Sequence, residues 1–127
     1  MRAIPILAEP DHHPHPVKQP QEAVELLLAG DLPSAIFCGN DMLAFGAYRG
    51  LSRSGIRVPE DVVLIGYDDI DFAASAIVPL TSIRQPSFDM GREAASLLLA
   101  ALAGGDEPLQ SVRFEPRLVE RQTTNRT

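Results

Sequence analysis

Two segments of the sequence place polar side chains directly after short apolar runs. Phe37 and Asn40 belong to the first segment, and Asp68 and Asp69 end the second. The Asn40 amide can donate and accept hydrogen bonds, and the two carboxylates are strong charged acceptors. Phe37 adds a flat apolar ring. A carbohydrate presents apolar C–H faces and a fringe of hydroxyl groups, so these side chains together match the surface of a sugar.

Each of these residues also has a purely structural interpretation. Asn40 or Asp41 can cap the helix that follows, and one of them could cap while the other binds. On pattern alone, an apolar core is the favoured position for Phe37. Asp68 and Asp69 suit the end of a strand and the start of a turn. The residue types alone leave these alternatives open.

Catalytic and metal chemistry find little support in the sequence. The three histidines, His12, His13 and His15, all lie in a proline-rich stretch, and there is no Gly-x-Ser-x-Gly motif around a nucleophile. Prolines between the histidines leave a metal site with Asp11 without a fixed geometry. Cys38 lies in an apolar run and is predicted to be a buried, inert thiol. We therefore expect no enzyme activity, no metal and no cofactor.

The apolar patterns predict the elements that position the two polar segments. We expect helices over 21–29, 41–54 and 87–103, and strands over 34–38, 62–67, 80–83, 111–114 and 118–119. The uninterrupted run over 62–67 is typical of a strand covered on both faces. Strands that alternate with helices predict an α/β fold, with a parallel sheet and helices on both faces. Ligands of such sheets bind beyond the carboxyl ends of strands, where both polar segments are expected.

Length and charge limit the classes of function. The 127 residues suit one domain, with a Pro/His-rich, irregular arm over 1–20 in which 4–8 could form a short strand. The formal net charge of −6 makes the chain a poor DNA-binding module by itself. No apolar run approaches the roughly 20 residues that cross a membrane. No signal peptide is visible and the only cysteine cannot form an internal disulfide, so we expect a cytoplasmic protein.

Four segments in order resemble the LacI family of transcriptional regulators. They cover residues 33–47, 55–69, 79–95 and 116–124. The resemblance implies part of a periplasmic-binding-protein-like fold of type I, in which two α/β subdomains close on a small ligand. It implies ligand contacts from the residues that match Phe37, Asn40 and Asp68, with Gln85 near the site. It also implies a homodimer interface on the helix face that carries Phe45, Tyr48 and Arg49.

This resemblance predicts that residues 21–127 are the C-terminal portion of an effector-binding domain, whose effector is a small molecule of the sugar class. We expect the helix-turn-helix and one wall of the cleft to be absent from this chain, which would then be a truncated form that does not function alone. Operator DNA would be bound only through the absent domain. The alternative is a sugar-binding protein of an ABC-type transporter, which shares the fold. We also expect exposed apolar surface, self-association and binding of a hydrophobic dye.

Overall fold

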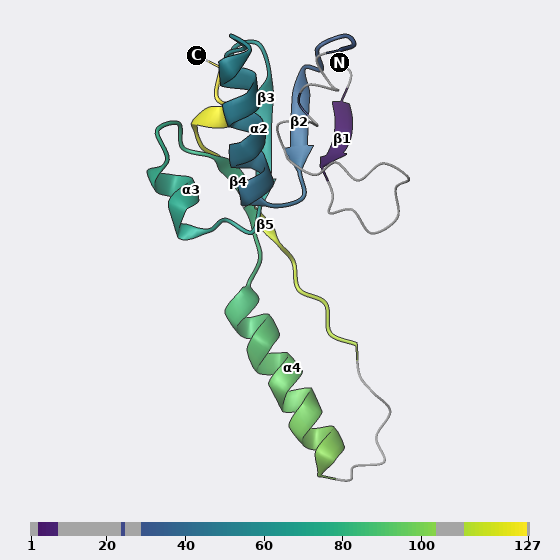
Figure 1. The fold of residues 1–127 in the computed structure, drawn as a ribbon. Coiled ribbons are helices and arrows are strands. Elements are labelled where there is room, and N and C mark those ends of the chain that lie inside the picture. The colour runs from purple at the N-terminus through teal and green to yellow at the C-terminus, as the bar shows by residue number, and fades with distance from the viewer. Residues whose placement is uncertain (1–2, 8–23, 25–28, 104–110, 127) are drawn as a thin grey trace. The chain divides into compact units, whose positions relative to one another are not determined.

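The computed structural model describes residues 3–7, 24, 29–103 and 111–126 (Figure 1). By their contacts, residues 1–84 and 118–127 form a first unit, and residues 85–117 form a second. The elements in chain order are β1 (Ala3–Leu7), β2 (Ala35–Cys38), α2 (Asp41–Arg53), β3 (Val63–Tyr67), α3 (Asp71–Ser75), β4 (Thr81–Arg84), α4 (Ser87–Leu102), β5 (Arg117–Val119) and the short 3-10 helix η1 (Gln122–Thr124). The second unit contains α4, and each unit is described by itself.

The strands form one sheet in the order β1-β2-β3-β4-β5. β1 pairs with β2, β2 with β3, and β3 with β4, all in parallel. The predicted α/β class with a mostly parallel sheet is confirmed. β1 also confirms the short strand that we considered possible within the N-terminal arm, whereas the histidines of that arm lie outside the described residues.

The helix α2 begins and ends where the sequence predicts. The side-chain oxygen of Asn40 accepts a hydrogen bond of 2.8 Å from the backbone N–H of Leu43, which caps the first turn. Gly55 adopts a φ of 75°, a conformation that favours glycine, directly after the C-cap residue Ser54. Ala44 and Leu51 are among the residues that α2 buries, and the helix packs on β2 and β3 (Figure 1).

The core of the first unit lies between α2 and the central strands. Its buried apolar residues are Val24, Ile36, Cys38, Ala44, Ala47, Leu51, Val62, Leu64, Ala73 and Leu80. In β3, Leu64 and Gly66 are buried, while Val63, Ile65 and Tyr67 are half-buried. The apolar run predicts a strand that is covered on both faces, but only one face of β3 is fully buried.

Several predicted elements differ from the structure. The strand predicted over 111–114 is wrong, because residues 111–116 form no ladder in the part of the chain that is described. The helices α3 and η1 were not predicted. Most of the helix predicted over 21–29 lies outside the described residues, of which Val24 is helical and buried. The helix α4 confirms the prediction over 87–103 to within one residue, and none of its residues is buried.

No helix in the described ranges is long and apolar enough to cross a membrane.

Candidate functional site

The carboxyl ends of β2 and β3 lie at the same edge of the sheet, because the two strands are parallel. Phe37 lies one residue before the end of β2, and Tyr67 is the last residue of β3. Their ring centroids are 6.5 Å apart and the planes are nearly perpendicular, at 83°. Both residues are half-buried. The aromatic surface predicted from Phe37 is thus shared with Tyr67, which the sequence analysis missed although it directly precedes Asp68.

Asn40 follows β2 and has a structural role. Its side-chain oxygen caps α2, while its side-chain NH2 group donates to no acceptor in the described part of the chain. The residue is half-buried. Capping and ligand binding therefore need different atoms of the same side chain.

Asp68 and Asp69 lie beyond the end of β3, where they turn the chain. Their φ values are 100° and 52°, so they leave the extended conformation in which adjacent side chains point to opposite faces. Asp68 is exposed, and its backbone N–H donates to the carbonyl of Ile83 at 2.9 Å. The turn keeps this carboxylate at the surface, directly after Tyr67 of the aromatic pair.

The Asp69 carboxylate is committed to two arginines. Its side chain is 1% exposed, and it forms ion pairs with Arg84 and with Nη2 of Arg121, the latter at 2.7 Å. Oδ1 of Asp69 takes part in the ion pair with Arg121, but it accepts no hydrogen bond of good geometry from the described residues. A buried carboxylate held by two guanidinium groups has a structural role, which leaves Asp68 as the exposed acid of the pair.

Asp41 is a third carboxylate at this edge, and it is 1% exposed. Its Oδ2 accepts from the Ile70 N–H at 2.9 Å, and its Oδ1 accepts from the Ser82 hydroxyl at 2.5 Å. Burial raises the pKa of Asp41, and the negative charges of Asp69 and Asp68 act in the same direction against the two hydrogen bonds. The sequence predicts Asp41 only as an alternative cap or ligand.

Two of the three predicted dimer residues, Phe45 and Tyr48, line an apolar groove of the first unit. Phe45 and Tyr48 are half-buried, and Arg49 is exposed. The ring of Phe45 lies 5.1 Å from that of Phe72 on α3, with the planes at 64°. The groove measures about 170 Å³ and is completed by Leu64, Ala76, Ile77, Val78, Leu80 and Thr123.

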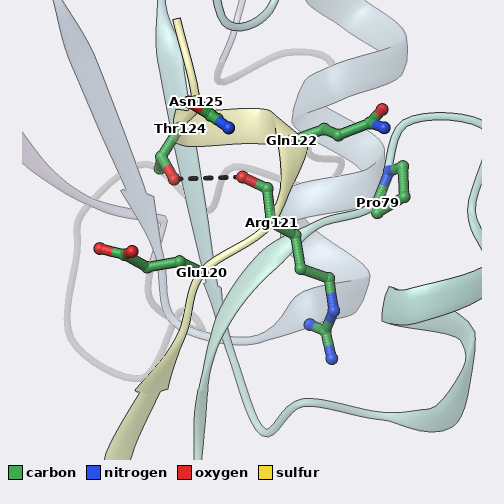
Figure 2. A pocket seen from close by; sticks show the side chains of 6 residues that line it. All are labelled: Pro79, Glu120, Arg121, Gln122, Thr124 and Asn125. Carbon is green, nitrogen blue, oxygen red and sulfur yellow. Dashed lines mark hydrogen bonds between the residues drawn. The ribbon is translucent and has the colours of Figure 1, made fainter.

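A larger pocket, of about 700 Å³, is lined by Pro79, Glu120, Arg121, Gln122, Thr124 and Asn125 (Figure 2). Figure 2 shows the Arg121 side chain extending away from the 3-10 helix. Its Nη1 donates to the Leu80 carbonyl at 2.7 Å, and Nη2 pairs with Asp69. The Thr124 hydroxyl lies 2.8 Å from that of Thr81. Arg121 and Thr124 are thus engaged within the protein, which favours a structural role for both.

Two further predicted residues have separate positions. Gln85 is half-buried and opens the second unit, so it is not placed with the other predicted ligand residues. Cys38 is fully buried, as predicted, and burial, with a smaller effect from the charge of Asp41, raises the pKa of its thiol to about 12. Among the described residues, no group of three or more His, Cys, Asp or Glu side chains could hold a metal ion.

Comparison with protein families finds one matching model. It is described as the periplasmic binding protein-like domain, and it matches residues 5–124.

Individual relatives of the chain are transcriptional regulators. The chain is 38% identical over 112 residues to the HTH-type transcriptional repressor PurR of Haemophilus influenzae. The matched segment covers 83% of the chain and 33% of the repressor. The chain therefore spans about a third of the length of the curated relatives that it matches.

Two solved structures that resemble the chain contain sugars. One is a LacI family transcriptional regulator from Enterococcus faecium with bound ribose, with 36% identity and a TM-score of 0.74, over 83% of this chain and 39% of that one. The other is the transcriptional regulator CelR in complex with cellobiose, with 40% identity and a TM-score of 0.75, over 82% of this chain and 32% of that one.

Proposed function

Because the chain belongs to the family of periplasmic binding protein-like domains, in the form found as the effector-binding domain of LacI-type regulators, we propose that it supplies one wall of a site for a small carbohydrate. This wall lies at the carboxyl ends of β2 and β3. Its relatives are transcriptional regulators and not enzymes. The role proposed for the chain is accordingly binding without chemistry.

One observation carries the proposal: an aromatic pair, an amide whose donors have no acceptor among the described residues, and an exposed carboxylate lie at or just beyond the carboxyl ends of adjacent parallel strands. The rings of Phe37 and Tyr67 suit the C–H face of a sugar. The Asn40 amide can donate to a hydroxyl, and the Asp68 carboxylate can accept from one. Gln85 is proposed as a further ligand residue on the family resemblance. The ribose and cellobiose bound by the two structural relatives support the choice of a carbohydrate.

The regulatory part of the proposal concerns the whole protein. In it, the effector favours one arrangement of the subdomains in a cytoplasmic homodimer, and this changes how paired helix-turn-helix heads fit an operator. The chain contributes effector contacts and, through Phe45, Tyr48 and Arg49, dimer contacts. The transporter-associated alternative shares the fold, but the relatives described above are regulators, which favours the regulator.

Titration of the isotope-labelled chain with ribose, and separately with cellobiose, tests the sugar site by NMR. We expect saturable shifts of the Asn40 and Asp68 amides with at least one of the two sugars. The Asp68→Asn variant should weaken this binding about tenfold or more, because a hydrogen bond to a charged group contributes roughly 1.5–3 kcal/mol.

Asp71→Asn is the matched control, since Asp71 is an exposed aspartate of α3 outside the proposed wall. It should bind the sugar as the unmodified chain does. Absence of saturable shifts with both sugars, or equal affinity of the Asp68→Asn variant, would contradict the proposal.

A further inference from the structure

A buried carboxylate connects the two polar segments of the proposed wall. Asp41 is the first residue of α2 and directly follows Asn40. Its carboxylate reaches across to the turn after β3, where Oδ2 accepts from the Ile70 N–H at 2.9 Å. Oδ1 accepts from the Ser82 hydroxyl on β4 at 2.5 Å. One side chain thus joins α2, the turn after β3, and β4.

The turn itself is held at three consecutive backbone N–H groups. That of Asp68 donates to the Ile83 carbonyl at 2.9 Å, that of Asp69 to the Ser82 hydroxyl at 3.1 Å, and that of Ile70 to Asp41. Two of these three acceptors are side chains, Ser82 and Asp41, and these are bonded to each other. The Ser82 hydroxyl accepts from the Asp69 N–H and donates to Oδ1 of Asp41.

This anchoring stabilises a conformation that the turn residues do not favour by themselves. Asp68 and Asp69 both have positive φ, and non-glycine residues in such conformations cost on the order of 1 kcal/mol or more each. Such a turn persists when surrounding contacts over-determine it. The ion pairs of Asp69 with Arg84 and Arg121 add to the backbone anchors.

Gly66 on β3 leaves space for the Asp41 side chain. A Cβ atom added to Gly66 would lie 2.2 Å from Oδ1 of Asp41 and 3.0 Å from a side-chain carbon of Leu80. Only glycine lets the carboxylate approach β3 so closely. Gly66 in the second polar segment therefore provides the space that the Asp41 carboxylate of the first segment occupies.

The geometry points to Asp41 and Ser82 as positioning residues, which hold the Asp68 turn in the conformation that presents its carboxylate to an effector. The effector role of Asp68 rests on the proposed function. The holding of the turn rests on hydrogen bonds and ion pairs within the chain and not on any effector, so the two can fail separately.

Amide hydrogen exchange of the whole chain, measured by NMR, tests the holding of the turn. In Asp41→Ala we expect the Ile70 amide to exchange about fivefold faster or more, since losing one hydrogen bond is worth roughly 1 kcal/mol, while the amides of β3 change less than about twofold. In Ser82→Ala the Asp69 amide should respond in the same way. Asp41→Asn keeps an acceptor for Ile70 and should restore slow exchange to within about threefold of the unmodified chain.

Ser75→Ala is the control, because Ser75 is an exposed serine of α3 and takes no part in these bonds. Unchanged exchange at both amides, or a uniform increase that includes β3, would overturn the positioning role. If Asp41→Ala does not fold, the Ser82→Ala and Asp41→Asn variants decide.

A ribose titration of the same variants separates this inference from the proposed function. If the unmodified chain binds ribose, Ser82→Ala should weaken binding several-fold without any contact of its own to the sugar. If ribose affinity is unchanged while the turn amides exchange faster, the turn is held but does not serve the effector, and that part of the inference is wrong. If neither ribose nor cellobiose binds the unmodified chain, the proposed function fails, and the exchange pattern still decides whether Asp41 and Ser82 hold the turn.

Discussion

Asp41, Asp68 and Asp69 are three carboxylates at one edge of the sheet, and their surroundings give them different roles. Asp69 is buried and paired with two arginines, Asp41 is buried and accepts from an amide and a hydroxyl, and Asp68 is exposed. A buried carboxylate without partners is strongly unfavourable, so the two buried acids are tied to the fold. The exposed one, Asp68, keeps its carboxylate at the surface, where an effector can reach it.

Cys38 allows a test of the environment next to Asp41. Because burial and the charge of Asp41 raise the pKa of this thiol to about 12, almost none of it is ionised near neutral pH. Relative to an unfolded thiol, alkylation by iodoacetamide at mildly alkaline pH should be about a thousandfold slower, since each unit of pKa changes the thiolate fraction about tenfold.

The measurement is the mass of the chain after timed labelling, with the chain in concentrated urea as the reference. Cys38 is the only cysteine, so the labelled mass is unambiguous. The rate should rise with pH as the thiolate forms. Comparable rates in buffer and in urea would show that Cys38 is not buried in solution.

The types of residue at the candidate site could be predicted from the sequence better than the separate role of each residue. The positions of Phe37, Asn40 and Asp68 at or just beyond the ends of two parallel strands follow from the pattern of apolar runs. The ion pairs of Asp69 do not follow from this pattern. Their partners Arg84 and Arg121 lie 15 and more residues away in the chain and meet Asp69 only in the folded sheet. Tyr67 was missed because the last residue of an apolar run resembles core.

At the scale of elements, local signals decide which parts are predictable. The helix α2 has a capping asparagine, an apolar face and a terminal glycine, and its bounds follow from them. The five-residue helix α3 has no side-chain cap, and a tertiary bond from the Leu80 N–H to the Ala73 carbonyl ties it to the chain before β4. The alternating residues of 111–114 resemble a strand, but a strand also needs a partner, which no sequence period supplies.

Asn40 links an element to the site, and two substitutions separate its two roles. Asn40→Ala removes the cap and should lower the free energy of unfolding by about 1 kcal/mol, within the usual 0.5–2 kcal/mol for a lost cap. Asn40→Ser keeps a capping oxygen and should leave stability nearly unchanged, but it removes the amide donors proposed to bind the sugar. Urea denaturation measures the first effect, and ribose titration the second.

A loss of stability in Asn40→Ser equal to that in Asn40→Ala would contradict the assignment of the cap. Equal ribose affinity in Asn40→Ser and the unmodified chain would remove Asn40 from the proposed wall, whatever its effect on α2.

At the scale of the whole molecule, apolar surface remains exposed on both units. In the first unit, Phe72 is 57% and Ile77 is 98% exposed beside the groove that contains Phe45 and Tyr48. In the second, α4 buries none of its residues and exposes Phe88, Met90, Leu98, Leu99 and Leu102. Contiguous apolar surface of this kind marks sites of association, so two surfaces compete for the role of dimer interface.

We predict that the chain self-associates through the groove of the first unit and binds a hydrophobic dye. Ile77→Glu should weaken association at least tenfold, because it removes an apolar side chain worth roughly 1.5–3 kcal/mol on burial and places a charge at the interface. Leu99→Glu makes the same change at an exposed position of α4 that is 67% exposed, and serves as the matched control. Light scattering after size-exclusion chromatography, over a series of concentrations, measures the dissociation constant.

The pair of variants distinguishes the two surfaces because each introduces the same charge on a different unit. Weakening by Ile77→Glu alone assigns the interface to the groove of Phe45 and Tyr48, whereas weakening by Leu99→Glu alone assigns it to α4 and contradicts the prediction. The dye should still bind the dissociated Ile77→Glu variant, since the apolar side chains of α4 remain accessible in it. A compact monomer of the unmodified chain with no dye response would mean that both surfaces are covered in solution, and would exclude the dimer proposed for this chain.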